Sequence, residues 1–418
     1  MSEADWDRLQ YYSRKVKFIA MSPDTHGPQV HPSTYIRIAQ LQTSVLFPSL
    51  RRLHYNLGNN FISHIFLFLS PLLHSLELFN IGGFENNIVG PFLATLSSQM
   101  LTRIVLHTGR MSADVLKNFI VHSKQLRSLD LTDAVVMSDF SIWEVLGTLP
   151  SLEGLTLKAV DSGSHPTHIP ENSNSRSESP KYFEALKALS VTGSFFLIQH
   201  LLGFIDSQCL KSINIYPVTN PVRFPEAIMT MVVSKWSQSL KKLVIDSSAF
   251  ANARRSGCEI STELMLLTDL HKIQAFHLKV WKMENMDNDV RRLVMSWPNL
   301  RTLKLIPLNQ TSISLSTLRI IAENCPELRY LGVRLDNSTF DTTTSSKSLH
   351  HNLEFLDVRV DVRSSSTQTR LECQIQVARN LDLIFPYLKS IEVEPNDDGT
   401  WSGIRNLVKL CQEIRRVK

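Results

Sequence analysis

The sequence is poor in cysteine, and the cysteines that it has are not arranged in pairs. Five are spread over 418 residues, none in a Cys-x-x-Cys pair: Cys209, Cys258, Cys325, Cys373 and Cys411. A scattered, odd set of this kind predicts neither a disulfide framework nor a zinc site. The opening "MSEADWDRLQYY" also lacks the basic-then-apolar pattern of a secretion signal. We therefore expect a cytoplasmic and/or nuclear protein.

Long apolar runs and blocks of one charge are absent as well. The most apolar stretch, "FISHIFLFLSPLL" (61–73), is broken by His64, Ser70 and Pro71. It falls short of the roughly 18 apolar residues that a membrane helix needs. The net charge is +5, and the basic pairs are scattered through the chain. We expect neither membrane insertion nor strong binding to nucleic acid.

Motifs for catalysis and cofactor binding are missing. No glycine-rich phosphate loop and no Gly-x-Ser-x-Gly elbow occurs. His165 and His168 have the spacing of metal ligands, but they lie in a polar stretch without companion ligands. The sequence predicts no catalytic residue, no cofactor and no metal site. A Ser/His/Asp hydrolase is not excluded by sequence, although nothing points to one.

What the sequence does contain is a repeat. In "CPELRYLGVRLD" (325–336), Leu328, Leu331 and Val333 follow the pattern L-x-x-L-x-L, in which other aliphatic residues also occur. Counting weaker copies, the pattern occurs fourteen times from Val16 to Leu388, with a mean step of about 29 residues. The copies begin at Val16, Leu50, Leu73, Leu101, Leu126, Leu152, Leu186, Leu210, Leu240, Ile273, Leu300, Leu328, Leu353 and Leu388.

The spacing predicts a leucine-rich-repeat solenoid. The fourth and sixth positions lie two apart, so both side chains point to one face of a short strand, and the first reaches the same interior from a turn. Only a neighbouring repeat can bury them. The predicted fold class is α/β, a horseshoe with parallel strands on the concave face and helices on the convex face. We expect one array over 1–418, with about fourteen irregular repeats.

Between the strands the apolar period changes to that of a helix. "SADVLKNFIVHS" (112–123) has Ser112 as a candidate cap, and "SLSTLRIIAENCP" (314–326) places Leu318, Ile321 and Ala322 on one stripe. "FPEAIMTMVVSKW" begins with Pro225 at a first-turn position. Two polar stretches interrupt the array. We expect a disordered loop at 161–180 and a second, shorter polar loop at 336–351.

The third, fifth and seventh positions of each strand face away from the core and line the concave side. In the later repeats these positions form a modestly basic surface with two aromatic residues embedded in it. Tyr and Arg are enriched at binding hot spots. Parallel strands would place His277, Lys304 and Gly332 side by side. The candidate partner-binding residues are Lys242, His277, Lys279, Lys304, Tyr330, Arg334, Phe355 and Arg359.

The charge on these positions argues against nucleic acid as the partner. From Leu50 onward, the basic residues are Arg52, Arg103, Lys158, Lys242, Lys279, Lys304, Arg334 and Arg359. The acidic residues are Glu77, Asp130, Asp246, Asp357, Glu392 and Glu394. Eight against six is too small a surplus for strong binding to a phosphate backbone. A protein partner on the concave face is the expectation.

The repeats "LFPSLRRLHY", "FLSPLLHSLEL", "WPNLRTLKL" and "CPELRYLGV" resemble those of the large fungal family of F-box/leucine-rich-repeat proteins. The opening "DWDRLQYYSRKVKFIAM" looks like the segment that follows the F-box in that family. The resemblance implies a substrate-recognition protein whose F-box docks a Skp-type adaptor of a cullin ubiquitin ligase. This chain begins after the place where the F-box would end, so adaptor docking is expected only if an F-box is supplied upstream. The alternative is a free-standing leucine-rich-repeat scaffold or inhibitor without a ligase link.

Overall fold

The architecture comes from a computed structural model. It describes residues 3–21, 32–41, 45–57, 62–81, 86–96, 100–108, 111–132, 140–159, 182–218, 226–247, 260–279, 283, 285–307, 311–335, 348–359, 370–393 and 400–417. The chain forms two compact units, Met1–Cys209 (unit 1) and Leu210–Lys418 (unit 2). Three features of the sequence analysis lie outside the described residues: the predicted loop at 161–180, Pro225, and the 336–347 part of the second predicted loop.

Unit 1 alternates strands and helices. Its strands are β1 (Phe18–Met21), β2 (Arg52–Asn56), β3 (Ser75–Ile81), β4 (Arg103–Thr108), β5 (Ser128–Thr132), β6 (Gly154–Lys158) and β7 (Ala188–Gly193). Its helices are α1 (Glu3–Ser13), α2 (Pro32–Leu41), the 3₁₀ helix η1 (Ile62–Phe68), α3 (Asn86–Leu96), α4 (Ala113–His122), α5 (Phe140–Gly147) and α6 (Phe195–Phe204). The strands pair in chain order and all are parallel.

Unit 2 repeats the scheme. Its strands are β8 (Ser212–Pro217), β9 (Lys242–Asp246), β10 (Ala275–Lys279), β11 (Thr302–Ile306), β12 (Tyr330–Arg334), β13 (Phe355–Arg359) and β14 (Ser390–Val393). Its helices are α7 (Glu226–Trp236), α8 (Ser261–Leu266), η4 (Leu267–Asp269), α9 (Met286–Ser296), α10 (Leu315–Asn324), α11 (Arg370–Ile384) and α12 (Thr400–Val417). These strands are also parallel and in chain order.

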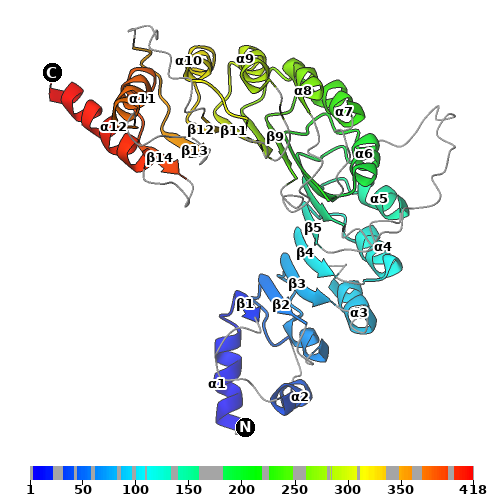
Figure 1. Ribbon diagram of the computed structural model, residues 1–418. Coiled ribbons are helices and arrows are strands. Elements are labelled where there is room, and N and C mark those ends of the chain that lie inside the picture. The colour runs from blue at the N-terminus through cyan, green and yellow to red at the C-terminus, as the bar shows by residue number, and fades with distance from the viewer. Residues whose placement is uncertain are drawn as a thin grey trace, which may run out of the picture. The chain divides into compact units, whose positions relative to one another are not determined.

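Within each unit the strands form one layer and most of the helices a second layer on one side of it, while α1 lies beyond β1 and α12 beyond β14 (Figure 1). The strand pairs form in the register that the repeat predicts: Leu129 lies opposite Leu155, and Leu155 opposite Leu189. The first-position leucines of the same repeats, Leu126 and Leu152 among them, are fully buried. The predicted fold class is therefore confirmed, and the units are leucine-rich-repeat solenoids.

A recurring backbone hydrogen bond joins successive repeats. The carbonyl oxygen at the second position of one repeat accepts the N–H groups of the second and third positions of the next. Arg301 O, for example, accepts from Arg329 N at 2.9 Å and from Tyr330 N at 3.2 Å. Arg329 O in turn accepts from Glu354 and Phe355. Because a buried backbone group must find a partner, this arrangement fixes the turn that precedes each strand.

The helices bury the predicted stripes. In α10, Leu318 and Ile321 are fully buried, and the Ser314 hydroxyl accepts a hydrogen bond from Thr317 N at 3.3 Å. Ser112 occupies the N-cap position of α4 with an extended backbone, but its side chain makes no capping hydrogen bond. The predicted cap is thus right in position and wrong in its contact. No helix among the described residues is long and apolar enough to cross a membrane.

The turn between α10 and β12 shows the role of Cys325, which precedes the repeat in "CPELRYLGV". Cys325 follows the last residue of α10, and its thiol donates to Trp297 O at 3.5 Å, which anchors the end of α10 to the preceding repeat. The Nε2 atom of His351, in the following repeat, lies 2.8 Å from Cys325 O. Burial raises the pKa of the Cys325 thiol to about 12. This cysteine is structural.

Candidate functional site

The candidate site is the strand face of unit 2, defined here by the third, fifth and seventh positions of β9 to β13. The strand register confirms the predicted neighbours: His277 pairs with Lys304, and Lys304 with Gly332. Tyr330 lies beside Phe355, and Arg334 beside Arg359. All eight candidate residues therefore come from consecutive parallel strands of one unit.

Lys304, Tyr330 and Asp357 form a cluster on this face. The Lys304 ammonium lies 3.1 Å from the Asp357 carboxylate and donates to the Tyr330 hydroxyl at 3.4 Å. The hydroxyl of Tyr330 donates to the same Asp357 oxygen at 3.0 Å. The ammonium also lies 5.7 Å from the centre of the Tyr330 ring, within the range of a cation–π contact. The three side chains hold one another in place.

Gly332 makes this cluster possible. It lies in the same row as Lys304 and Asp357, on the strand between theirs. A Cβ atom at Gly332 would lie 3.1 Å from Lys304 Cγ and 3.4 Å from Tyr330 Cε1. Because glycine leaves this space empty, the lysine side chain can cross β12 and reach a carboxylate two strands away.

The cluster also shifts the pKa values of two of its members, Lys304 and Tyr330. Burial lowers the pKa of Lys304, but the hydrogen bond from its ammonium to Asp357 and the contacts with Tyr330 outweigh it, so the pKa is raised. The pKa of Tyr330 is raised too, first by burial and then by the charge of Asp357. Both groups therefore keep their protons at neutral pH.

His277 is partly buried on this face. Its Nε2 atom is buried and has no hydrogen-bond partner among the described residues. The pKa of its imidazole is lowered, mainly by burial and further by the charges of Lys242 and Lys304. The imidazole is therefore neutral at neutral pH and offers no charge to a partner.

Phe355 is the exposed candidate, and the other seven are partly buried. Phe355 is 40% exposed, which is high for a phenylalanine on a strand. Lys279 lies 3.6 Å from Asp246, so this cation is already paired. Val244 and Ile306, which occupy other positions on the strand face, are buried.

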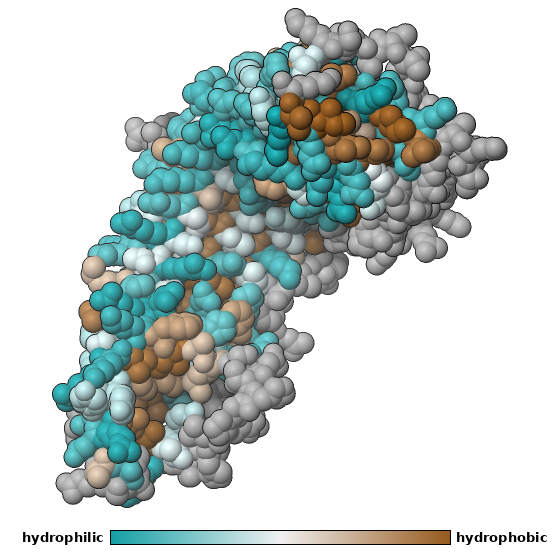
Figure 2. Space-filling view, turned by 90° about the vertical axis from the view of Figure 1, so that its left-hand side faces the viewer, coloured by the Kyte–Doolittle hydropathy of each residue, from teal (hydrophilic) through white to brown (hydrophobic). Residues whose placement is uncertain are grey.

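The basic character of this face is modest. Five basic residues (Lys242, Lys279, Lys304, Arg334 and Arg359) stand against three acidic ones (Asp246, Asp357 and Glu392) on β9 to β14. Figure 2, which is coloured by hydropathy, shows hydrophilic side chains over much of the visible described surface and hydrophobic ones in separate patches. A surface of this kind fits a polar protein partner with one or two aromatic contacts.

Sequence reasoning missed a second cluster, on the strands of unit 1. The ring of Phe79 lies between two imidazoles, with ring centres 4.4 Å from His54 and 4.2 Å from His107. Glu77 lies 3.1 Å from His54 and 3.4 Å from Arg103. These residues occupy the third, fifth and seventh positions of β2 to β4, so listing those rows for the early repeats would have found them.

Asp130 extends the unit 1 cluster onto β5. Its Oδ1 atom is buried without a hydrogen-bond partner among the described residues. Burial raises the pKa of its carboxyl, against the opposing charges of His107 and Arg103. A carboxylate kept in such a place is costly for stability, which makes it a functional candidate.

Within the described ranges, no group of three or more His, Cys, Asp or Glu side chains is placed to hold a metal ion. His165 and His168 lie outside those ranges.

No family model matches the chain, and no curated protein matches it. Among solved structures, it is similar to yeast Rad7 in its complex with Elc1, at 15% identity and a TM-score of 0.39, covering 87% of this chain and 93% of that one. It is also similar to the leucine-rich-repeat protein LegL7 from Legionella pneumophila, at 10% identity and a TM-score of 0.37, covering 94% and 97% of the two chains. TM-scores below 0.5 support no inference about function.

Proposed function

We propose that this chain is a non-catalytic protein–protein interaction module whose partner binds the strand face of unit 2. The observation that carries the proposal is the Lys304–Tyr330–Asp357 cluster with exposed Phe355 beside it. A rigid aromatic and charged group surrounded by polar rows has the composition of a binding hot spot. The neutral and charged members are held in place before any partner arrives, which lowers the entropic cost of binding.

The finer proposal is a substrate-recognition role in a cullin ubiquitin ligase. Its support is the resemblance of the repeats, and of the segment that forms α1 and β1, to F-box/leucine-rich-repeat proteins. An F-box supplied upstream would dock the Skp-type adaptor, and the strand face would hold the substrate. Without it, the chain acts as a free-standing scaffold or inhibitor.

Affinity purification with mass spectrometry tests the binding face. The variant carries Lys242→Glu, Lys279→Glu and Phe355→Ser, which change accessible side chains and leave the Lys304–Tyr330–Asp357 cluster intact. A matched control carries Lys117→Glu, Lys235→Glu and Met295→Ser on the helices. We expect the wild type and the control to capture the same specific partners. The amount of each partner captured by the variant should be at least tenfold lower. Equal capture by all three chains removes this face from consideration.

The ligase role needs its own readout. If the chain acts in a ligase, a form extended by the in-frame upstream sequence captures a Skp-type adaptor and a cullin. If no F-box is encoded there, and neither protein is captured, the scaffold or inhibitor role holds. The two results do not depend on which residues bind the substrate.

A further inference from the structure

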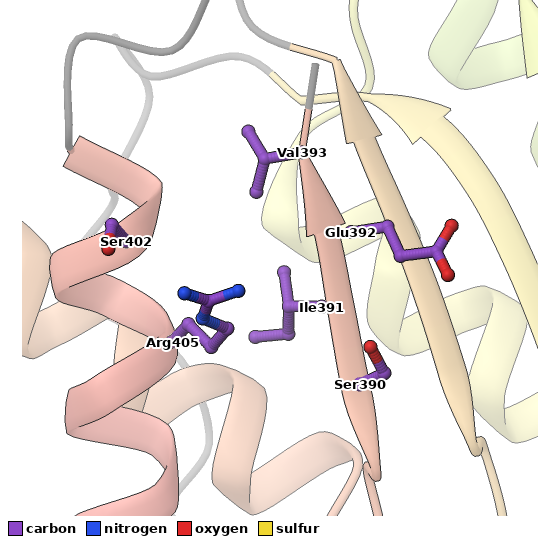
Figure 3. Close-up of a pocket in the computed structure, with 6 residues that line it drawn as sticks. All are labelled: Ser390, Ile391, Glu392, Val393, Ser402 and Arg405. Carbon is purple, nitrogen blue, oxygen red and sulfur yellow. The ribbon is translucent and has the colours of Figure 1, made fainter. Parts of the chain in front are cut away.

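The last strand of unit 2 borders a hollow. Four consecutive residues of β14, from Ser390 to Val393, line it together with Ser402 and Arg405 of α12, and its volume is about 480 Å³. Side chains of consecutive strand residues point to opposite faces. A space that touches all four must therefore run along the edge of the strand. Figure 3 shows Ile391 and Val393 on the side of α12 and Glu392 directed away from it.

This edge has unused backbone groups. Ser390 N donates to Glu354 O, so Ser390 directs its N–H toward β13. In a parallel ladder, alternate residues direct their N–H and C=O groups to opposite neighbours. Ile391 and Val393 therefore direct theirs away from β13, into the hollow. Among the described strands, none pairs with β14 on that side. Such an edge is a template for another extended chain.

The hollow also carries a positive charge. The Arg405 side chain reaches from α12 toward β14 beside Ile391 (Figure 3), and it is exposed. It forms no ion pair with any residue that the structure describes. Lys409 lies one helical turn further along the same face and is exposed as well. An acidic group lying along β14 would meet both cations.

We propose that the free edge of β14 binds an extended, acidic peptide segment of another protein, which adds to the sheet as a further strand. The backbone of the segment pairs with Ile391 and Val393, and one of its carboxylates meets Arg405. Recognition of this kind takes its affinity from main-chain hydrogen bonds and its specificity from alternate side chains. This site is separate from the strand face.

The charge argues against a second copy of the chain as the occupant. Two copies joined edge to edge across a two-fold axis present the same patch to each other. Each patch carries the exposed cations Arg405 and Lys409, so two copies would bring four positive charges into one interface. An acidic peptide has the opposite sign.

Two substitutions test the two parts of the site. Val393→Pro removes an N–H that points into the hollow. Proline is tolerated at this position of an edge strand because the N–H that it lacks is not one that pairs with β13. Arg405→Glu reverses the charge. The matched control is Arg416→Glu, an exposed residue in the last turn of α12. Thermal melts of the three variants show whether each still folds, and only folded variants enter the comparison.

The probe is a displayed library of random nine-residue peptides, selected on the full 418-residue chain. We expect recovered peptides to carry Asp or Glu among alternating β-branched residues. Their affinity should fall about tenfold or more with Arg405→Glu or Val393→Pro and stay unchanged with Arg416→Glu, because one charge-assisted hydrogen bond is worth that much. Methylating the peptide amides that face β14 should abolish binding, and methylating the alternate amides should not.

Three outcomes overturn the proposal. One is a selection in which the wild-type chain recovers no more peptides from the library than the Arg405→Glu, Val393→Pro double variant does. Another is binding that is indifferent to both substitutions or to which amides are methylated. The third is a chain that dimerises through this edge, shown by a dimer in sedimentation that Val393→Pro dissociates. The Lys242→Glu, Lys279→Glu, Phe355→Ser variant should bind the peptides normally, so failure of one site is distinguishable from failure of the other.

Discussion

The hydroxyl of Tyr330 donates to the carboxylate of Asp357 on the next strand, with 3.0 Å between the oxygens. The same hydroxyl accepts from Lys304 on the strand before it. One phenol thus joins three adjacent strands of unit 2. The neighbouring rows expose Phe355 and carry further cations.

Removing the hydroxyl should cost stability. Tyr330→Phe leaves the ring in place but takes one donor from Asp357 and one acceptor from Lys304. We expect the free energy of unfolding to fall by about 1 kcal/mol, the usual net value of such a bond. Urea denaturation measures it. Tyr387→Phe is the control, since Tyr387 is 56% exposed, and it should change nothing. Equal effects of the two substitutions contradict the cluster.

The cluster should also make stability depend on alkaline pH. The pKa values of Lys304 and Tyr330 are raised above their ordinary values of 10.5 and 10.0. The folded state thus holds both protons more tightly than the unfolded chain does. Their stabilisation is complete below the unfolded values and is lost as the pH rises through the folded ones.

Asp357→Asn removes the charge that both groups share. We expect the wild type to lose stability above about pH 10 more steeply than this variant, as followed by urea midpoints between neutral and alkaline pH. Parallel curves for the two chains would show that Asp357 does not couple to these protons.

His351 should matter for stability in acid, and its neighbour should not. Its Nε2 pairs with Cys325 O and its Nδ1 accepts from Leu353 N at 3.1 Å, so the neutral ring uses both nitrogens. Burial lowers its pKa, against the opposing hydrogen bond to Cys325. The unfolded chain takes up a proton near its ordinary pKa of 6.5 that the folded chain resists. Stability should therefore fall as the pH drops below that value.

His350, next to it in sequence, is exposed and gives a matched control. His351→Ala should cost about 2 kcal/mol at neutral pH, because it leaves the Leu353 N–H without a partner and removes one of the two donors to Cys325 O, the other being Leu328 N. It should also flatten the acid dependence of stability. His350→Ala should do neither. A loss of stability from both substitutions, or from neither, would contradict the assigned role.

Asp130 should destabilise unit 1 at neutral pH. Its pKa is raised by burial, so folding opposes its charged form, and stability is lost as the pH rises through its titration. Asp130→Asn should raise the melting temperature at neutral pH. It should also weaken the dependence of the melting temperature on pH between acid and neutral pH. Asp114→Asn, at an exposed position in the first turn of α4, should not raise it. If Asp130→Asn lowers the melting temperature, the carboxylate is paired and the candidate site in unit 1 loses its main support.

The repeat made the strands predictable because its physics is local. Leu331 and Val333 lie two residues apart and must share a face, so the strand, its inner side and its outer rows follow from spacing alone. The same reasoning placed His277 beside Lys304. The division into two compact units was not predicted, and the expectation that they act as one array of about fourteen repeats stays a prediction.

The chemistry of the outer rows was less predictable. Sequence placed His277, Lys304 and Gly332 in one row but could not show that the lysine crosses the glycine to reach Asp357 on the next strand. It treated the cations as available for a partner, whereas Lys304 and Lys279 are already paired with acids. Side-chain rotamers decide such pairings, and spacing does not determine them.

The central claim is that a partner binds the strands of unit 2 and not the helices, and site-specific photocrosslinking tests it most directly. A benzophenone amino acid placed at Phe355, which is 40% exposed on β13, is compared with one at Met295, which is 63% exposed on α9. The account predicts that a discrete partner is crosslinked in cells from position 355 and not from position 295. Crosslinking from position 295 alone, or equally from both, would contradict it.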